Sequence, residues 1–333
     1  MKGRAIPAVL PQLPTPVQLE IEFTNRCNAN CSACPRHEMG DFGLMTATTL
    51  DRILTAYKEV RMNHPLNVGR EGGRYPQVTI AGGGDPFIHP NAISLIEQCV
   101  ASDFPPHVIT NASRLGAQID ALIDAKPRSI NVSFWGINDV EYQAAMRLPF
   151  GQTLDIVERL AEAAAGAGIP FVILWVDVPE IRSSRREIEH FWARRGIEVD
   201  MSDNHMWNRA GLMPMPRDLV VDSAVVVPPD FEREIWCSDL YFSDTYRWNG
   251  DAILCCCNYF AGRPHVLGNI ADTSPAAVST TKGSVLVSPP AMCRSCALPR
   301  QVRAEWLAGP WLKHLGEKER ASLLYKGRGA GQA

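Results

Sequence analysis

The chain has 333 residues, of which 46% are hydrophobic and 21% are charged, as is usual for a soluble globular protein. Its net charge of −3 gives no basic surface for nucleic acid, and no apolar run is long enough to span a bilayer. The length exceeds one compact core of average size and is short for three domains.

Residues 1–16 form an arm that several prolines interrupt, which excludes the continuous apolar core of a signal peptide. We therefore expect a cytoplasmic protein. Ten cysteines without an export signal favour metal binding or catalysis over disulfides.

Strand-like and helix-like segments then alternate up to about residue 201. This alternation is typical of βαβ units with a parallel sheet, either closed into a barrel or open and doubly wound. Thr46 or Thr48 is expected to cap the first helix. The predicted strands are Val17–Phe23, Gln77–Ala81, His107–Thr110, Ser129–Phe134, Phe171–Val178 and Ile197–Met201, and the predicted helices are Thr46–Val60, Pro90–Ala101, Leu115–Ala125, Thr153–Ala167 and Ser183–Arg195.

The pattern changes after Trp207, where prolines, tryptophans and cysteines become dense. We place a domain boundary near residues 208–230. Asn249-Gly250 predicts a hairpin turn between two short strands. The Ser-, Thr- and Pro-rich segment Thr273–Pro290 is predicted to be a loop, Glu305–Tyr325 a helix, and residues 327–333 a disordered tail.

Three cysteines, Cys27, Cys31 and Cys34, follow the first predicted strand with the spacing C-x3-C-x2-C. Three thiolates on a [4Fe–4S] cube would leave one iron open to an outside molecule. Zinc is the alternative, with His37 as a fourth ligand, but structural zinc sites usually pair C-x2-C knuckles. The spacing therefore favours an iron–sulfur cluster with an open position.

This motif resembles the signature of the radical S-adenosylmethionine (radical SAM) enzymes, although Ala33 stands where the family usually has an aromatic residue. The resemblance implies a partial (β/α)6 TIM-like barrel over residues 17–215. It also implies a cluster whose open iron binds SAM, reductive cleavage of SAM to a 5′-deoxyadenosyl radical, and a flavodoxin- or ferredoxin-type reductant. The radical would take a hydrogen atom from the substrate.

A second set of cysteines occupies the later region. By spacing alone, four thiolates there suit zinc and iron–sulfur equally well. The region resembles the twitch domain, a shortened SPASM domain that follows the barrel in several radical SAM subfamilies. The resemblance implies a small α+β auxiliary domain at residues 216–310, before a C-terminal helix and tail at 311–333. It also implies one auxiliary [4Fe–4S] cluster bound by Cys237, Cys255, Cys293 and Cys296.

Two cysteines of this region, Cys256 and Cys257, are left over. A buried free cysteine usually packs as a small apolar residue, and this is the simpler interpretation. Alternatively, one thiol returns a hydrogen atom to a substrate radical, or exchanges as a cluster ligand. Cys99 lies within a predicted helix and is expected only to pack.

The glycine-rich turn after the second predicted strand contains Gly83, Gly84 and Asp85. A plain tight turn is one interpretation. The resemblance implies instead the Gly-Gly-Glu motif that binds the SAM amino group, with Asp85 replacing Glu. It further implies SAM contacts by Asn111 and Ser133 near the ribose or carboxylate, Arg147 at the carboxylate and Val176 at adenine.

The substrate is expected to enter at the carboxyl ends of the strands, beneath a roof of His205, Trp207, Arg209 and Tyr259. Since only about sixteen residues precede the first strand, we expect a small molecule in place of a ribosomal peptide. The closest layout is that of radical SAM aminocyclitol dehydrogenases. The alternatives are an epimerase with Cys256 or Cys257 as hydrogen donor, a peptide-modifying enzyme of the sulfatase-maturase kind, and a non-catalytic electron carrier or zinc scaffold.

Overall fold

The computed structural model describes most of the chain between residues 15 and 296. The described residues are 15–64, 67, 74–176, 178–201, 212, 240, 242–261, 264–287 and 290–296. Cys237, the predicted roof residues 205, 207 and 209, the predicted helix 305–325 and the tail 327–333 lie outside them.

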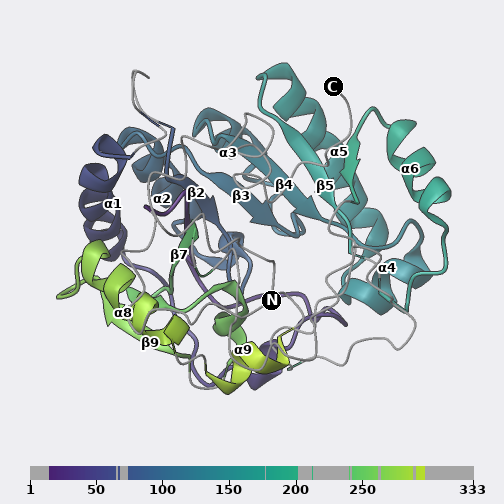
Figure 1. Ribbon diagram of the computed structural model, residues 1–333. Helices are drawn as coiled ribbons and strands as arrows, with labels where there is room; N and C mark the ends of the chain where they lie inside the picture. The colour runs from purple at the N-terminus through teal and green to yellow at the C-terminus, as the bar shows by residue number, and fades with distance from the viewer. Residues whose placement is uncertain are drawn as a thin grey trace, which may run out of the picture.

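The described strands form one curved sheet in the order β6-β5-β4-β3-β2-β1-β7-β8-β9. Strands β1 to β7 pair parallel with one another, whereas β8 pairs antiparallel with both β7 and β9. This is the expected partial barrel, with α1, α2, α3, α5 and α6 along the outer side (Figure 1). The strands are β1 Gln18–Ile21, β2 Gln77–Ile80, β3 His107–Thr110, β4 Ser129–Ser133, β5 Phe171–Leu174, β6 Glu198–Asp200, β7 Ser243–Tyr246, β8 Asp251–Ile253 and β9 Val266–Asn269.

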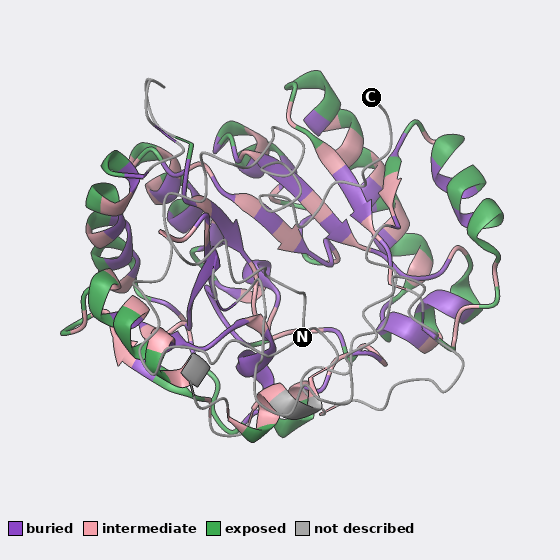
Figure 2. Cartoon of the chain, viewed as in Figure 1, coloured by how far each residue is buried: buried purple, intermediate pink, exposed green. Residues whose placement is uncertain are grey.

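The strands alternate between an apolar outer face and a polar inner face. In β1, Leu19 and Ile21 are fully buried beneath the helices, whereas Gln18 and Glu20 face the opposite side. Figure 2 shows the buried residues running along the strands and the inward faces of the helices. The hydrophobic core therefore lies between sheet and helices. The inside of the curve carries polar side chains on β1 to β4, together with the apolar Ile109, Val172 and Leu174.

Most predicted helices are present with shifted ends. Thr46 caps α1, accepting a hydrogen bond from the Thr49 amide at 3.0 Å, and Ser184 and Glu187 form a capping box at α6. Helix α4 was missed because it is short and lies between two predicted elements. The helices are α1 Ala47–Met62, α2 Ala92–Ala101, α3 Ile119–Asp124, α4 Asp139–Met146, α5 Phe150–Gly166, α6 Arg185–Ala193, α8 Pro275–Val287 and α9 Ala291–Ser295, with 3-10 turns η1 Arg36–Glu38, η3 Pro86–Ile88 and η5 Cys256–Phe260.

The prediction of a loop at Thr273–Pro290 was wrong, because α8 occupies most of it. Proline stands at the first position of the helix, where its missing N–H costs nothing. The hydroxyl groups of Thr280 and Thr281 donate to the carbonyls of Ala276 and Ala277, each at 3.0 Å. Sequence analysis missed this helix because its composition is polar. In the structure, its hydroxyl groups donate hydrogen bonds to its own backbone.

Strand β7 continues the barrel sheet by pairing parallel with β1. The predicted turn follows it, with Gly250 at φ +87°, and leads into β8. The sheet therefore crosses from the predicted barrel into the predicted auxiliary region, while the exact domain boundary stays a prediction. In the part of the chain described, no helix combines the length and apolarity needed to cross a membrane.

Lys282 of α8 ties this region to the barrel. Its side chain is 2% exposed, and Nζ donates to Asp244 Oδ1 at 2.7 Å and to the Ser243 carbonyl at 2.6 Å. The other Asp244 oxygen accepts from the Tyr57 hydroxyl of α1 at 2.6 Å. One buried carboxylate on β7 thus joins two helices.

We predict that Lys282→Ala lowers the free energy of unfolding by about 3–5 kcal/mol, because Asp244 is left as a buried charge without its cation. Lys58→Ala, which removes an exposed lysine of α1, should change it by less than about 0.5 kcal/mol. Urea unfolding of both variants without oxygen measures the difference. Equal effects would contradict a structural role for the buried pair.

Candidate active site

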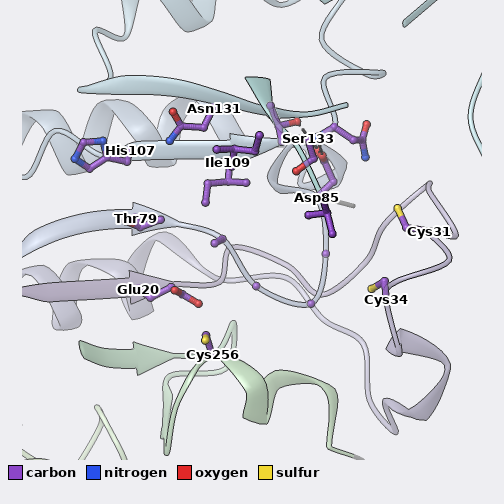
Figure 3. A pocket seen from close by; sticks show the side chains of 18 of the residues that line it. Glu20, Cys31, Cys34, Thr79, Asp85, His107, Ile109, Asn131, Ser133 and Cys256 are labelled. Atoms are coloured by element: carbon purple, nitrogen blue, oxygen red, sulfur yellow. Dashed lines mark hydrogen bonds between the residues drawn. The ribbon is translucent and has the colours of Figure 1, made fainter. Parts of the chain in front are cut away.

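A cavity of about 420 Å³ lies inside the curve of the sheet. Its walls come from the inner faces of β1 to β5, the loops after β1 and β2, the end of β6 and the turn η5 (Figure 3). Side chains from both ends of the strands line it, from His107 at the start of β3 to the cysteine loop after β1. A cavity of this size suits a small molecule or cofactor.

The predicted cluster cysteines line one wall together. Cys27, Cys31 and Cys34 are all half-buried and all border the cavity. Their loop is held by α4: the Ser32 amide donates to the Ala145 carbonyl at 2.8 Å. The helix that sequence analysis missed therefore positions the cysteine loop.

These three thiols lie near one another in an environment that disfavours free thiolates. Burial, then the Asp85 charge, raises the pKa of Cys27 to about 11. Burial, then the charges of Cys34 and Cys27, raises the pKa of Cys31 further. Thiolates in this environment need a nearby positive charge to be stable. A bound metal provides that charge, and the thiols lose their protons when it binds.

The donor set fits an iron–sulfur cube that has one open position. It contains three thiols from one loop, bordering a cavity in which a further ligand has space. A cube places each thiolate on a different iron, so its ligands stand farther apart than those of one zinc ion.

The glycine loop after β2 faces the same cavity. Gly82 has φ +144°, and a Cβ on Gly84 would collide with the backbone of Arg26. The Asp85 amide donates to that Arg26 carbonyl at 3.0 Å. Glycine is therefore required for this loop to lie against the start of the cysteine loop.

Asp85 borders the cavity but is committed to the chain. Its carboxylate accepts hydrogen bonds from the Phe87 amide at 3.0 Å, the Thr110 hydroxyl at 2.8 Å and the Asn111 amide at 2.7 Å. Burial nevertheless raises the pKa of Asp85. These hydrogen bonds join the glycine loop to the end of β3. The backbone of Gly83 and Gly84 faces the cavity.

Of the other predicted SAM contacts, Asn111, Ser133 and Val176 line the cavity, and Arg147 does not. Arg147 ends α4 in a left-handed conformation, φ +59°, and is exposed. Sequence analysis missed two cavity residues, Arg36 and Trp135. In the part of the chain that the structure describes, Arg36 Nε and Trp135 Nε1 are buried without a hydrogen-bond partner. The only sequence signal for Arg36 was its position two residues after Cys34.

A second group of thiols gathers where β8, η5 and α9 meet. Cys257 contacts Cys255, Cys256 and Cys296, and these contacts, ahead of burial, raise its pKa well above the ordinary value. Burial, then the charges of Cys255 and Cys296, raises the pKa of Cys293 to about 12. The described members of the predicted auxiliary site are therefore together, with Cys257 added.

The two leftover cysteines differ in what they face. Cys256 is half-buried and borders the cavity, where Figure 3 shows it beneath Glu20 of β1. Cys257 is 1% exposed and does not border the cavity. Of the two thiols proposed as hydrogen donors, only Cys256 is in a position to meet a substrate there.

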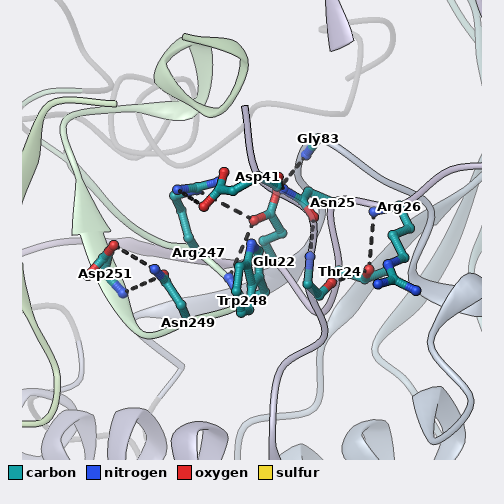
Figure 4. A network of polar contacts seen from close by, with 11 residues as sticks. Glu22, Thr24, Asn25, Arg26, Asp41, Gly83, Arg247, Trp248, Asn249 and Asp251 are labelled. Carbon is teal, nitrogen blue, oxygen red and sulfur yellow. Dashed lines mark hydrogen bonds and ion pairs between the residues drawn. The ribbon is translucent and has the colours of Figure 1, made fainter. Parts of the chain in front are cut away.

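Glu22, directly after β1, connects the glycine loop to the turn after β7 (Figure 4). One carboxylate oxygen accepts from the Gly83 amide at 2.8 Å, and the other accepts from the Trp248 amide at 3.3 Å. Arg247 lies 3.9 Å from Glu22 and forms an ion pair with Asp41 at 2.6 Å. A single buried acid thus fixes both sides of the site.

Burial raises the pKa of Glu22 from 4.5 to about 7, although the Gly83 amide and the Arg247 charge lower it. Between these values the folded chain holds a proton that the unfolded chain releases, so this group makes stability fall as pH rises. We predict that Glu22→Gln gains on the order of 2–3 kcal/mol of stability, relative to the original chain, between pH 4.5 and pH 7.

Urea unfolding at several pH values measures this change, with Glu38→Gln as a control because Glu38 is half-exposed. A constant difference in stability between Glu22→Gln and the original chain would show that Glu22 does not titrate in this window.

The family model described as "Radical SAM superfamily" matches residues 21–191. No curated protein matches the chain in sequence. Among solved structures, BtrN in complex with AdoMet and 2-DOIA has 13% identity and a TM-score of 0.54, covering 85% of this chain and 93% of BtrN. SuiB from Streptococcus suis, bound to precursor peptide SuiA, has 15% identity and a TM-score of 0.59, covering 86% and 71%.

Native anSMEcpe with AdoMet and the Cp18Cys peptide has 14% identity and a TM-score of 0.52, covering 90% of this chain and 87% of anSMEcpe. At such identities these likenesses show the fold alone. The family match spans more than half of the chain and includes the cysteine loop, the glycine loop and strands β2 to β5. The chain therefore belongs to the radical SAM superfamily.

Proposed function

We propose that this enzyme oxidises an alcohol carbon of a small polar natural-product intermediate, such as an aminocyclitol or a sugar, to a ketone. The observation that carries the proposal is a single cavity bordered by both thiol groups. The cysteine loop and the glycine loop lie on one side, and Cys256, next to the second group, lies on another. An oxidation needs a hydrogen abstractor and an electron acceptor near one substrate.

The chain offers ligands for the required groups. Cys27, Cys31 and Cys34 would hold the [4Fe–4S] cluster, and the predicted auxiliary cluster would be held by Cys255, Cys293 and Cys296 with Cys237. When bound, the first cluster and SAM supply a 5′-deoxyadenosyl radical, which is the chemistry of the family. The remaining task of the chain is to bind and orient SAM and substrate.

SAM binding is assigned to residues of the cavity wall. The backbone of Gly83 and Gly84 would receive the amino group, and Asn111 and Ser133 would face the ribose or carboxylate. Arg147 was predicted to pair with the carboxylate, but it does not border the cavity, whereas Arg36 does. We therefore assign the carboxylate to Arg36, whose buried Nε has no hydrogen-bond partner among the described residues. Val176 would pack on adenine.

The inner wall favours a hydroxylated substrate. Beyond the cysteine loop it presents Thr79, His107 and Asn131, whose side chains can donate or accept hydrogen bonds. In the described part of the chain, strands β1 to β5 and the turn η5 border the cavity, which supports a small molecule as the substrate. The likeness to SuiB and anSMEcpe keeps peptide modification as the alternative.

We predict that the anaerobically reconstituted full chain oxidises scyllo-inosamine, used as an aminocyclitol probe, when SAM and dithionite are supplied. With the probe deuterated at its ring carbons, deuterium should appear in 5′-deoxyadenosine, in about equal amount to the ketone. Mass spectrometry measures both products. Absence of label in 5′-deoxyadenosine, with SAM cleaved, would contradict hydrogen abstraction from this class of substrate.

A second candidate function is epimerisation. It is favoured by Cys256, which among the described thiols of the second group is the one that borders the cavity. We predict that Cys256→Ala retains ketone formation, because an oxidation needs no hydrogen donor. An epimerase would lose its product while SAM cleavage continues. Cys99→Ala, which removes a buried thiol that does not border the cavity, is the matched control. The fate of the probe in each variant, followed by mass spectrometry, separates the two functions.

A further inference from the structure

Four residues bordering the cavity have side chains that are ordinary proton acceptors. They are the carboxylates of Glu20, Asp85 and Asp200 and the imidazole of His107. Oxidation of an alcohol radical to a ketone requires that its hydroxyl proton be removed. The contacts and positions of these four groups show which is best suited to accept that proton.

Three of the groups are poorly suited to the task. Asp85 already accepts three hydrogen bonds from the chain. His107 begins β3, in register with Glu20 through Thr79 but two strands away from β1, and its Nδ1 is 2.7 Å from the Ser129 hydroxyl. Asp200 is on β6, at the far end of the sheet from β1 and β7.

Glu20 is the acid beside the second thiol group. It lies on the inner face of β1, where its half-buried side chain borders the cavity near Cys256 (Figure 3). The Tyr259 side chain, four residues after Cys255, borders the same cavity and lies close enough to Glu20 to be affected by its charge. Burial, followed by the Glu20 charge, raises the pKa of Tyr259 well above its ordinary value, so the phenol stays protonated.

We propose that Glu20 is the catalytic base of the oxidation, with Tyr259 as the residue that positions its carboxylate. This inference rests on the proposed function. Removal of the carbon-bound hydrogen atom leaves a hydroxyalkyl radical. Its O–H bond would break and the proton would pass to the Glu20 carboxylate as C=O forms. An iron–sulfur cluster held by the second thiol group would supply the acceptor for the remaining electron.

Placing the base beside the electron acceptor has a physical advantage. Loss of the proton makes the radical a much stronger reductant, so proton loss and electron loss assist each other. The Glu20 side chain and the Cys256 thiol border the same cavity, and Cys256 contacts Cys257 of the second group. Proton and electron would therefore leave the substrate toward the same wall.

The first test needs no turnover. The full chain, with its clusters reconstituted, is treated with a water-soluble carbodiimide and glycine ethyl ester, which couple accessible carboxylates, and is mapped by peptide mass spectrometry. We expect labelling at Glu20 and protection of that residue by scyllo-inosamine. Failure to label Glu20, while the exposed Glu198 is labelled, would overturn the proposal.

The second test compares Glu20→Gln with Glu198→Gln, which changes an exposed residue of β6 outside the cavity lining. Glu20→Gln keeps the size of the side chain and an oxygen that can accept from Tyr259. With deuterated scyllo-inosamine, we expect this variant to keep transferring deuterium to 5′-deoxyadenosine while ketone formation falls at least about 100-fold. Glu198→Gln should match the original chain in both.

The outcomes separate the two proposals. Ketone formation by Glu20→Gln at the original rate would overturn the role of Glu20 and leave the proposed oxidation intact. A loss of about 100-fold in Asp200→Asn, with Glu20→Gln unchanged, would move the base to Asp200. If the original chain forms no ketone from the probe, the proposed oxidation of an aminocyclitol fails, and the assignment of a base fails with it. Tyr259→Phe should lower ketone formation less than Glu20→Gln does.

Discussion

The parallel pairing of β1 with both β2 and β7 is the constraint on which the site depends. Because the three strands run in one direction, their carboxyl ends meet at the same edge of the sheet. The cysteine loop follows β1, the glycine loop follows β2, and the turn with Trp248 and Gly250 follows β7, whereas antiparallel β8 carries the chain back toward the other end before Cys255. Segments more than 200 residues apart in sequence are thus brought together by one register.

Buried polar groups reinforce this junction. Glu22 accepts hydrogen bonds from the amides of Gly83 and Trp248, and Asp244 joins α1 and α8 through Tyr57 and Lys282. A buried charge is costly unless it is paired and hydrogen-bonded, so each group specifies the arrangement that satisfies it. The two acids lie at opposite ends of the β1–β7 pair and restrain it at both.

Sequence periodicity predicted the repeating strands and helices well, since each carries an apolar stripe against one core. It failed at α8, whose hydroxyl groups bond to its own backbone, and at α4, which is too short to show a period. Spacing within one loop identified the three cysteines after β1, because ligands from one segment leave a local pattern. Residues that meet across a long stretch of sequence leave no local pattern. Nothing near Glu20 in sequence indicates that Tyr259 lies close to it, and nothing near Gly83 indicates its hydrogen bond with Glu22. Arg147 was assigned from resemblance, and its contact with SAM stays a prediction; Arg36, in the turn η1 just after the cysteine loop, borders the cavity.

The run Cys255-Cys256-Cys257 shows how a tight turn divides similar residues between two environments. A 3-10 turn places successive side chains about 120° apart around its axis. Cys256 therefore faces the cavity, while Cys257 faces the thiol group formed with Cys255 and Cys296. Tyr259, three residues after Cys256, is brought back to the same side. The turn thus presents a thiol and a phenol to the cavity, whereas Cys257 points away from it.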